Sequence, residues 1–264
     1  MFRLMFSSSE IVTGSERSDS FPAEYRELYK TVAPDPNWKI GFAHEGVQMI
    51  ESFQGNYSLI TILREPRDLL RSAFKVPVFE QCKEINQTMT MVEWLDNDIS
   101  TPCVNSLTLG LCNNGSHYPF KEELWDRFGP LPDALAESKE RLRQMTWFGL
   151  THRWTESICL LYYSFGWKPL SNMDWKAARV RHDTLPLTDE EDEAIRRVAW
   201  ADLELFKYAE EIFDGRIEQM KYEVLNQEYA TGRIVPEVWH LDCLRLIYGE
   251  NLSDSLIPIE PPQQ

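Results

Sequence analysis

The chain has 264 residues, enough for one large α/β domain with a substantial core or for two small domains. Its formal net charge of −15 argues against a nucleic-acid-binding protein, which gains affinity by neutralising phosphates with Lys and Arg. No run of 18 or more apolar residues is present, so no transmembrane segment is predicted. No Gly/Ser-rich or Pro-rich linker divides the sequence, which favours a single domain over residues 1–264 with flexible ends at 1–20 and 258–264.

The N-terminal part predicts a short helix over residues 21–33 and a weak strand over 38–42, which leads to His44. A lone histidine is more often a hydrogen-bonded structural residue than a catalyst. Imidazole is nevertheless suited to act as a general base near neutral pH, so both interpretations of His44 stay open.

Residues 58–74, SLITILREPRDLLRSAF, join a buried-strand pattern to groups that suit a phosphate. The apolar run 59–63 predicts a strand covered on both faces, ending at Arg64. Pro66 fits the first turn of a helix, where its missing N–H has no cost, and Ser72 follows two turns later. Because ligands of open α/β sheets bind beyond the carboxyl ends of the strands, Arg64 and Ser72 are candidates to hold a phosphate monoester.

A simpler alternative has equal weight on this stretch alone. Arg64 then pairs with Glu65 or Asp68 on the surface, and Ser72 faces solvent.

The middle of the chain predicts a polar helix over 79–98, in which Trp94 and Leu95 are the apolar anchors. Residues 101–115, TPCVNSLTLGLCNNG, are rich in turn formers and offer Asn105 and Thr108 as hydrogen-bonding groups. The spacing of Cys103 and Cys112 favours a loop that is closed by a disulfide between them.

The second half alternates helices and strands. Pro132 opens a helix, residues 146–150 predict a strand, and a further helix begins at Thr151, which favours a parallel sheet. A loop over 168–187 holds the densest basic cluster, and a capping box at Thr188 opens one long helix. That cluster comprises Lys176, Arg179, Arg181 and His182. Residues 236–248 predict a last helix.

Cysteines and glycosylation signals bear on the compartment. The five cysteines have no zinc-ligand spacing, and Cys159, on an apolar helix face, is expected to be a buried thiol. The chain has ten asparagines, and 31 of its 264 residues are Ser or Thr, so about one Asn-x-Ser/Thr acceptor is expected by chance. The chain has four. This excess favours a secretory lumen. The acceptors are Asn56, Asn86, Asn114 and Asn251.

Several of these segments, taken in order, resemble a carbohydrate sulfotransferase, most closely the heparan sulfate 6-O-sulfotransferase group. The stretch LITILREPRDLLRSAF resembles that family's strand and helix for the 3′-phosphate of the donor, with Glu65 in place of an aspartate. AESKERLRQMTWFGLTHRWTES resembles the stretch around Phe-Gly-Leu-Thr, and DEAIRRVAWADLELFKYAEEIFDGRI resembles a helix near the family's C-terminus. The resemblance covers roughly residues 38–225. It implies an α/β fold of the three-layer P-loop-NTPase-like sulfotransferase type, with a central parallel sheet that lacks its first strand.

The resemblance also implies roles for individual residues. His44, in GFAHEG, takes the place of the catalytic histidine, Arg64 and Ser72 hold the 3′-phosphate, and Asn105 and Thr108 lie near the donor. The loop with Arg179 and Arg181 occupies the place of one that closes over the nucleotide, although its sequence departs from the family's. The implied donor is 3′-phosphoadenosine 5′-phosphosulfate, the acceptor is a glycan hydroxyl, no metal is required, and the compartment is the Golgi lumen.

One motif of the family has no counterpart. Its phosphate loop, roughly Pro-Lys-Thr-Gly-Gly-Thr-Thr, cradles the 5′-phosphosulfate, and nothing in residues 1–43 matches it. The sequence is therefore expected either to be truncated after that loop or to have lost it. The alternative to an active sulfotransferase is a catalytically impaired relative that binds a nucleotide or a glycan.

Overall fold

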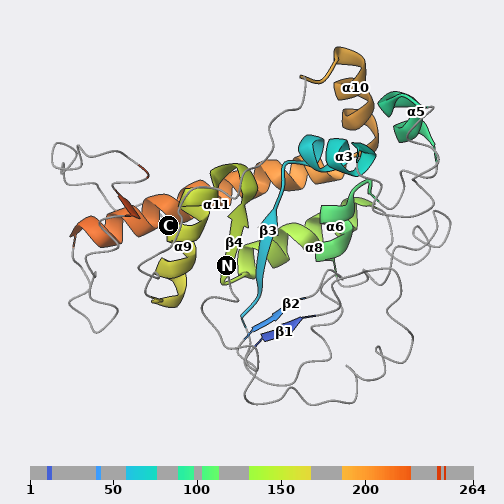
Figure 1. The fold of residues 1–264 in the computed structure, drawn as a ribbon. Coiled ribbons are helices and arrows are strands. Elements are labelled where there is room, and N and C mark those ends of the chain that lie inside the picture. Colours follow the sequence, from blue (N-terminus) through green and yellow to red (C-terminus); the bar gives the residue numbers. More distant parts are fainter. Residues whose placement is uncertain are drawn as a thin grey trace, which may run out of the picture. The chain divides into compact units, whose positions relative to one another are not determined.

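The structure is a computed structural model, drawn in Figure 1. It describes residues 11–13, 40–42, 58–75, 89–97, 103–112, 131–167, 186–226, 243–244 and 247. The elements with their bounds are β1 (Ile11–Thr13), β2 (Ile40–Phe42), β3 (Ile60–Leu63), α3 (Pro66–Lys75), α5 (Met91–Asp96), α6 (Ser106–Leu111), α8 (Leu131–Gln144), β4 (Trp147–Leu150), η3 (Thr151–Arg153), α9 (Trp154–Phe165), α10 (Asp189–Val198) and α11 (Trp200–Asn226). The predicted helix over 21–33 and residues 168–185 of the predicted basic loop over 168–187 lie outside the described residues.

The elements fall into two compact units that alternate along the chain. The first contains β1, β2, α3, α5, α6, α10, most of α8 and the start of α11 up to Leu205. The second contains β3, β4, η3, α9 and α11 from Phe206 onward.

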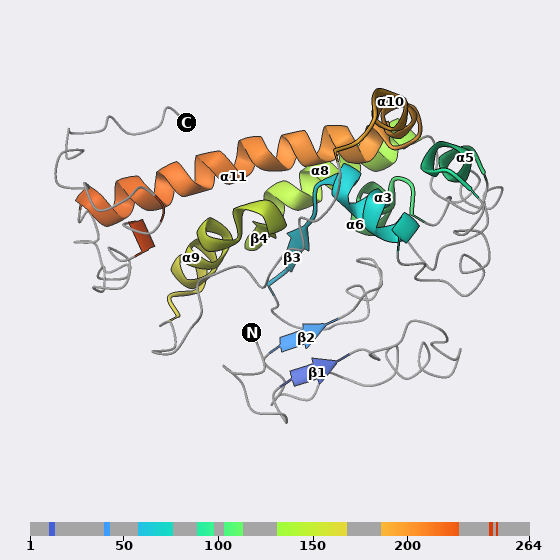
Figure 2. The same ribbon diagram turned by 45° about the horizontal axis from the view of Figure 1, so that its top comes forward.

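In the first unit, α3, α5 and α10 pack around a shared apolar cluster (Figure 2). The ring centroids of Phe74 and Trp94 are 5.6 Å apart, so α3 and α5 share an aromatic contact. Both α5 and α10 begin with a capping box, which confirms the one predicted at Thr188. The buried members of the cluster are Leu70, Met91, Trp94, Leu95, Ala194, Ile195 and Ala199. The predicted anchors Trp94 and Leu95 are thus confirmed.

In the second unit, β3 and β4 lie side by side as parallel strands (Figure 1). Their register pairs Ile60 with Trp147 and Leu63 with Leu150. All four residues of β4 are buried, whereas Ile62 of β3 is 41% exposed. The prediction that β3 is covered on both faces is therefore wrong, because an apolar run records residue type and not what packs on each face of the strand.

Parallel pairing also joins β1 to β2, from Ile11 opposite Ile40 to Thr13 opposite Phe42. The strand predicted over 38–42 is confirmed at 40–42. Every strand pair among the described residues is parallel, as expected for an α/β protein. Two two-stranded sheets do not define a three-layer P-loop-like architecture, which stays a prediction.

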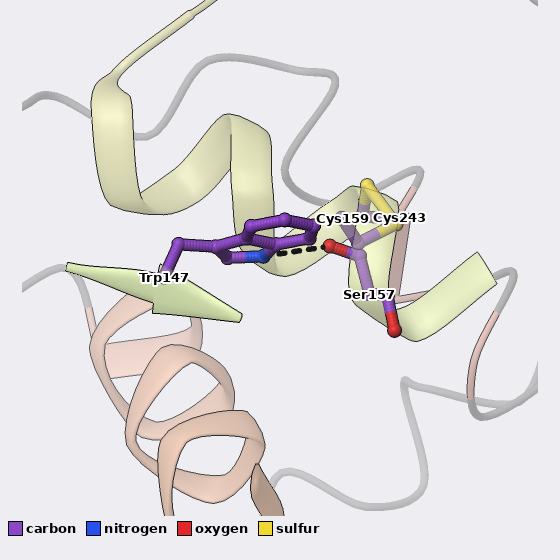
Figure 3. Close-up of a disulfide and its surroundings, with 4 residues drawn as sticks. All are labelled: Trp147, Ser157, Cys159 and Cys243. Atoms are coloured by element: carbon purple, nitrogen blue, oxygen red, sulfur yellow. Dashed lines mark hydrogen bonds between the residues drawn. A yellow bond between two sulfur atoms is a disulfide. The ribbon is translucent and has the colours of Figure 1, made fainter. Parts of the chain in front are cut away.

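A disulfide joins Cys159 of α9 to Cys243, across 84 positions of the chain (Figure 3). The Cα atoms are 5.6 Å apart, and both residues are buried. The expectation that Cys159 is a thiol is wrong. The predicted Cys103–Cys112 disulfide is wrong as well, because residues 106–111 form helix α6 between the two thiols instead of a loop.

Close packing at Gly149 predicts a large effect of one methyl group. A Cβ on Gly149 would lie 2.8 Å from two ring atoms of Trp147, whose indole N–H donates to the Ser157 carbonyl at 3.0 Å (Figure 3). Because the ring is buried and held by this hydrogen bond, Gly149→Ala is expected to destabilise the protein by about 1–3 kcal/mol. Urea unfolding measures this loss.

The matched control is Gly215→Ala in α11, where nothing lies within 4 Å of an added Cβ. That change should stabilise the protein by up to about 1 kcal/mol, because alanine is the better helix former. A Gly149→Ala variant that is as stable as Gly215→Ala would contradict the packing argument.

Candidate functional site

Arg64 lies at the carboxyl end of β3, directly after Leu63, where the sequence predicts it. Its side chain is partly buried, and no ion pair or hydrogen bond to it is present among the described residues. The alternative in which Arg64 is paired on the surface is therefore not what the structure shows. A guanidinium in this position keeps its five N–H donors for a ligand that carries negative charge.

The helix that follows β3 starts at Pro66, as predicted, and carries Ser72. Within the first unit, Arg67 of α3 donates to the Asp192 carboxylate at 2.6 Å, and Arg196 donates to the same carboxylate at 2.7 Å. The hydrogen bonds from Arg67 and Arg196 hold the pKa of Asp192 below its usual value. The bond from Arg67 fixes α3 against α10, whereas the bond from Arg196 lies within α10. A contact between Ser72 and a phosphate stays a prediction.

A histidine that the sequence analysis did not single out lies at the same edge of the sheet as Arg64. His152 belongs to η3, two positions after Leu150, the register partner of Leu63. Its Nε2 is 3.3 Å from the Oε1 of Glu210, and its ring centroid is 5.6 Å from that of Phe206. One signal in the sequence was available, because His152 follows a strand just as Arg64 does.

Its neighbour Arg153 is fully engaged by the protein. The guanidinium makes two hydrogen bonds of 2.6 Å to Glu156, a further one to Asp214, and lies 4.7 Å from the ring centroid of Phe213. The hydrogen bonds to Glu156 raise the pKa of Arg153, in spite of its partial burial. Arg153 therefore anchors η3 to α11, whereas Arg64 remains the cation suited to a ligand at this edge.

Asn105 joins the two helices α10 and α11, which the sequence predicts as one. In a continuous helix the Asp202 N–H would donate to the Val198 carbonyl, four residues earlier. Instead, the Asn105 side chain donates to that carbonyl at 2.9 Å and accepts from the Asp202 N–H at 3.2 Å. The prediction of one long helix is wrong because the Asn105 amide takes the place of this backbone bond, and α10 ends at Val198 with Ala199 as its C-cap.

Asp202 in turn caps the start of α6, the helix that follows Asn105. Its carboxylate accepts from the N–H groups of Leu107, at 3.2 Å, and Thr108, at 2.8 Å, which have no partner inside the helix. Burial raises the pKa of Asp202 to about 6, against the opposing effect of the groups on Thr108 and Leu107. The Asp202 carboxylate thus caps α6 from a buried position.

Thr108, the second residue predicted to lie near the sulfate-donor nucleotide, is hydrogen-bonded to Asp202 and Ser138. Its carbonyl accepts from the Ser138 hydroxyl at 2.6 Å, while its own hydroxyl is buried and has no hydrogen bond of standard geometry among the described residues. The structure brings Asn105 and Thr108 together as parts of the α6, α8, α10 and α11 packing. A direct contact of either residue to a nucleotide stays a prediction.

The remaining predicted site residues, His44, Arg179, Arg181 and His182, lie outside the described residues. Within the described ranges, no group of three or more His, Cys, Asp or Glu side chains is arranged to hold a metal ion. None of the helices described is long and apolar enough to cross a membrane. Comparisons with protein-family models, with curated proteins and with solved structures give no match for this chain.

Proposed function

We propose that this protein binds 3′-phosphoadenosine nucleotides at the carboxyl edge of β3 and is a sulfotransferase that acts on a carbohydrate hydroxyl. The observation that carries the proposal is Arg64, a partly buried guanidinium without a protein partner among the described residues, at the end of a strand in a parallel sheet. Ligands of such sheets bind at this edge. The choice of a 3′-phosphoadenosine nucleotide as the ligand comes from the resemblance of several segments, in order, to a carbohydrate sulfotransferase.

In the proposed reaction, an oxygen of the sugar attacks the sulfur of 3′-phosphoadenosine 5′-phosphosulfate. The bond between sulfur and the 5′-phosphate oxygen breaks, and its electron pair stays on the phosphate. His44 takes the proton of the sugar hydroxyl, while Arg64 and Ser72 hold the 3′-phosphate and select this donor over ATP. These roles rest on the resemblance.

A second candidate is a relative that binds the nucleotide but transfers little or no sulfate. Residues 1–43 contain no match to the family's phosphate loop, and a protein without such a loop would stabilise the charge on the leaving group poorly. One preorganised donor of this kind contributes about 2.7–4 kcal/mol to the transition state. Nucleotide binding is common to both candidates, so it is the property to test first.

A secretory, oxidising compartment is part of the proposal. The Cys159–Cys243 disulfide is of a kind that persists outside the reducing cytosol, and the four Asn-x-Ser/Thr acceptors favour the same compartment. These two features are independent of each other, and both fit an enzyme that modifies glycans in the Golgi lumen.

Calorimetric titration with 3′-phosphoadenosine 5′-phosphate tests the proposal. Arg64→Ala is expected to weaken binding about 10- to 100-fold, because a hydrogen bond to a charged group contributes roughly 1.5–3 kcal/mol. Lys75→Ala is the matched control, since it removes the same charge from an exposed position in the last turn of α3. Equal affinities for the wild type and Arg64→Ala, or no binding by a folded wild type, would refute the proposed site.

A further inference from the structure

His152 lies at the same edge of the sheet as Arg64, in the 3₁₀ helix η3 that follows the neighbouring strand β4. Leu63 and Leu150 are register partners, so the chain leaves β3 and β4 at the same level. Arg64 comes one position after Leu63, and His152 two positions after Leu150. Paired strands are about 4.8 Å apart, which is the scale of adjacent groups on one small molecule.

Contacts from α11 hold the imidazole of His152 in place without covering it. Glu210 lies 3.3 Å from Nε2, the Phe206 ring packs at 5.6 Å between centroids, and the side chain remains 37% exposed. Of the two neutral tautomers of His152, the one with its proton on Nε2 donates that proton to the Glu210 carboxylate. Nδ1 then has a lone pair and accepts a hydrogen bond.

A hydrogen-bond acceptor and a cation at one edge of a sheet suit a ligand that carries a hydroxyl next to an anionic group. Nucleoside 3′-phosphates have this pattern, because the ribose 2′-hydroxyl is on the carbon next to the 3′-phosphate. Arg153, the other basic residue of η3, does not provide it, since Glu156 and Asp214 already bind its guanidinium.

We propose that His152, positioned by Glu210, accepts a hydrogen bond from the ribose 2′-hydroxyl of the nucleotide whose 3′-phosphate is bound by Arg64. This inference rests on the proposed nucleotide site and adds a residue that recognises the sugar. It makes the site selective for ribonucleotides over 2′-deoxyribonucleotides.

The test is a cycle of four calorimetric titrations. Wild type and His152→Phe are each titrated with 3′-phosphoadenosine 5′-phosphate and with its 2′-deoxy analogue. Phenylalanine keeps an aromatic ring against Phe206 but has no nitrogen. The wild type is expected to bind the ribonucleotide about tenfold more tightly than the analogue, and His152→Phe to bind both with the lower affinity.

Lys207→Ala, an exposed change on the same helix, controls for charge and should retain the tenfold preference. Glu210→Ala, which removes the group that positions the imidazole, should lose most of it. A wild type that binds both nucleotides equally well would overturn the role of His152 while leaving the proposed function intact. A preference that persists in His152→Phe would overturn it too, and a folded wild type that binds neither nucleotide would overturn both proposals.

Discussion

Replacing Cys159 and Cys243 together by alanine is expected to lower the free energy of unfolding by about 4–5 kcal/mol, because the disulfide closes a long loop in the unfolded chain. The two residues are 84 positions apart, and both are buried beside the β4 and α9 packing of the second unit. Loss of the cross-link therefore increases the conformational entropy of the unfolded state. Urea unfolding of the wild type and the double variant measures the difference.

Reduction provides a second form of this experiment. Dithiothreitol should lower the urea midpoint of the wild type and leave that of the double variant unchanged. Cys103→Ala is the matched control, because Cys103 is only partly buried and is not in a disulfide, so its unfolding should keep the wild-type response to reductant. Peptide mapping without reductant that fails to find Cys159 linked to Cys243 would contradict the prediction.

Asp202→Asn is expected to gain stability relative to the wild type as the pH rises from 4 to 7. Burial raises the pKa of Asp202 from 3.8 to about 6. Between these two pH values, the folded state keeps a proton on Asp202 that the unfolded state has lost. The associated stability is present in full below about pH 4 and is lost as the pH rises through 6. A shift of this size corresponds to about 3 kcal/mol, and an asparagine does not titrate.

Urea unfolding of both proteins at several pH values between 4 and 7 measures this difference, and the comparison cancels the titration of groups that the two proteins share. Asp202→Ala is a useful third variant. It leaves the N–H groups of Leu107 and Thr108 buried without an acceptor, so it should be destabilised at every pH, by roughly 1–3 kcal/mol for each group. A difference between Asp202→Asn and wild type that stays constant with pH would show that Asp202 does not titrate in this range.

Local signals predicted several elements correctly. The change from the apolar run to Arg64 and Pro66 marked the end of β3 and the start of α3, and Thr188 marked the start of α10. Each of these signals depends on residues within one or two turns of each other, through a fixed φ or a side-chain cap. Such features can be recognised in the sequence without knowledge of the fold.

The errors came from interactions between distant segments. Nothing near Ala199 breaks a helix, since neither glycine nor proline occurs there. The break is completed by Asn105, whose side chain donates to the Val198 carbonyl 93 positions away. Cys159 pairs with Cys243 and not with a neighbour, because the helix between Cys103 and Cys112 makes the short pairing unavailable. Sequence spacing alone cannot rank such pairings.

The candidate site likewise has one part that local sequence predicts and another that depends on distant segments. The sequence by itself determined the chemistry and position of Arg64 at a strand end, because strand, arginine and proline are adjacent in the chain. Only the tertiary structure decided that His152 belongs to the same edge and that Glu210 and Phe206 hold its ring, since this needs the register of β3 with β4 and the packing of α11. Side-chain contacts of this kind depend on backbone paths that meet only in the folded protein, so no local pattern encodes them.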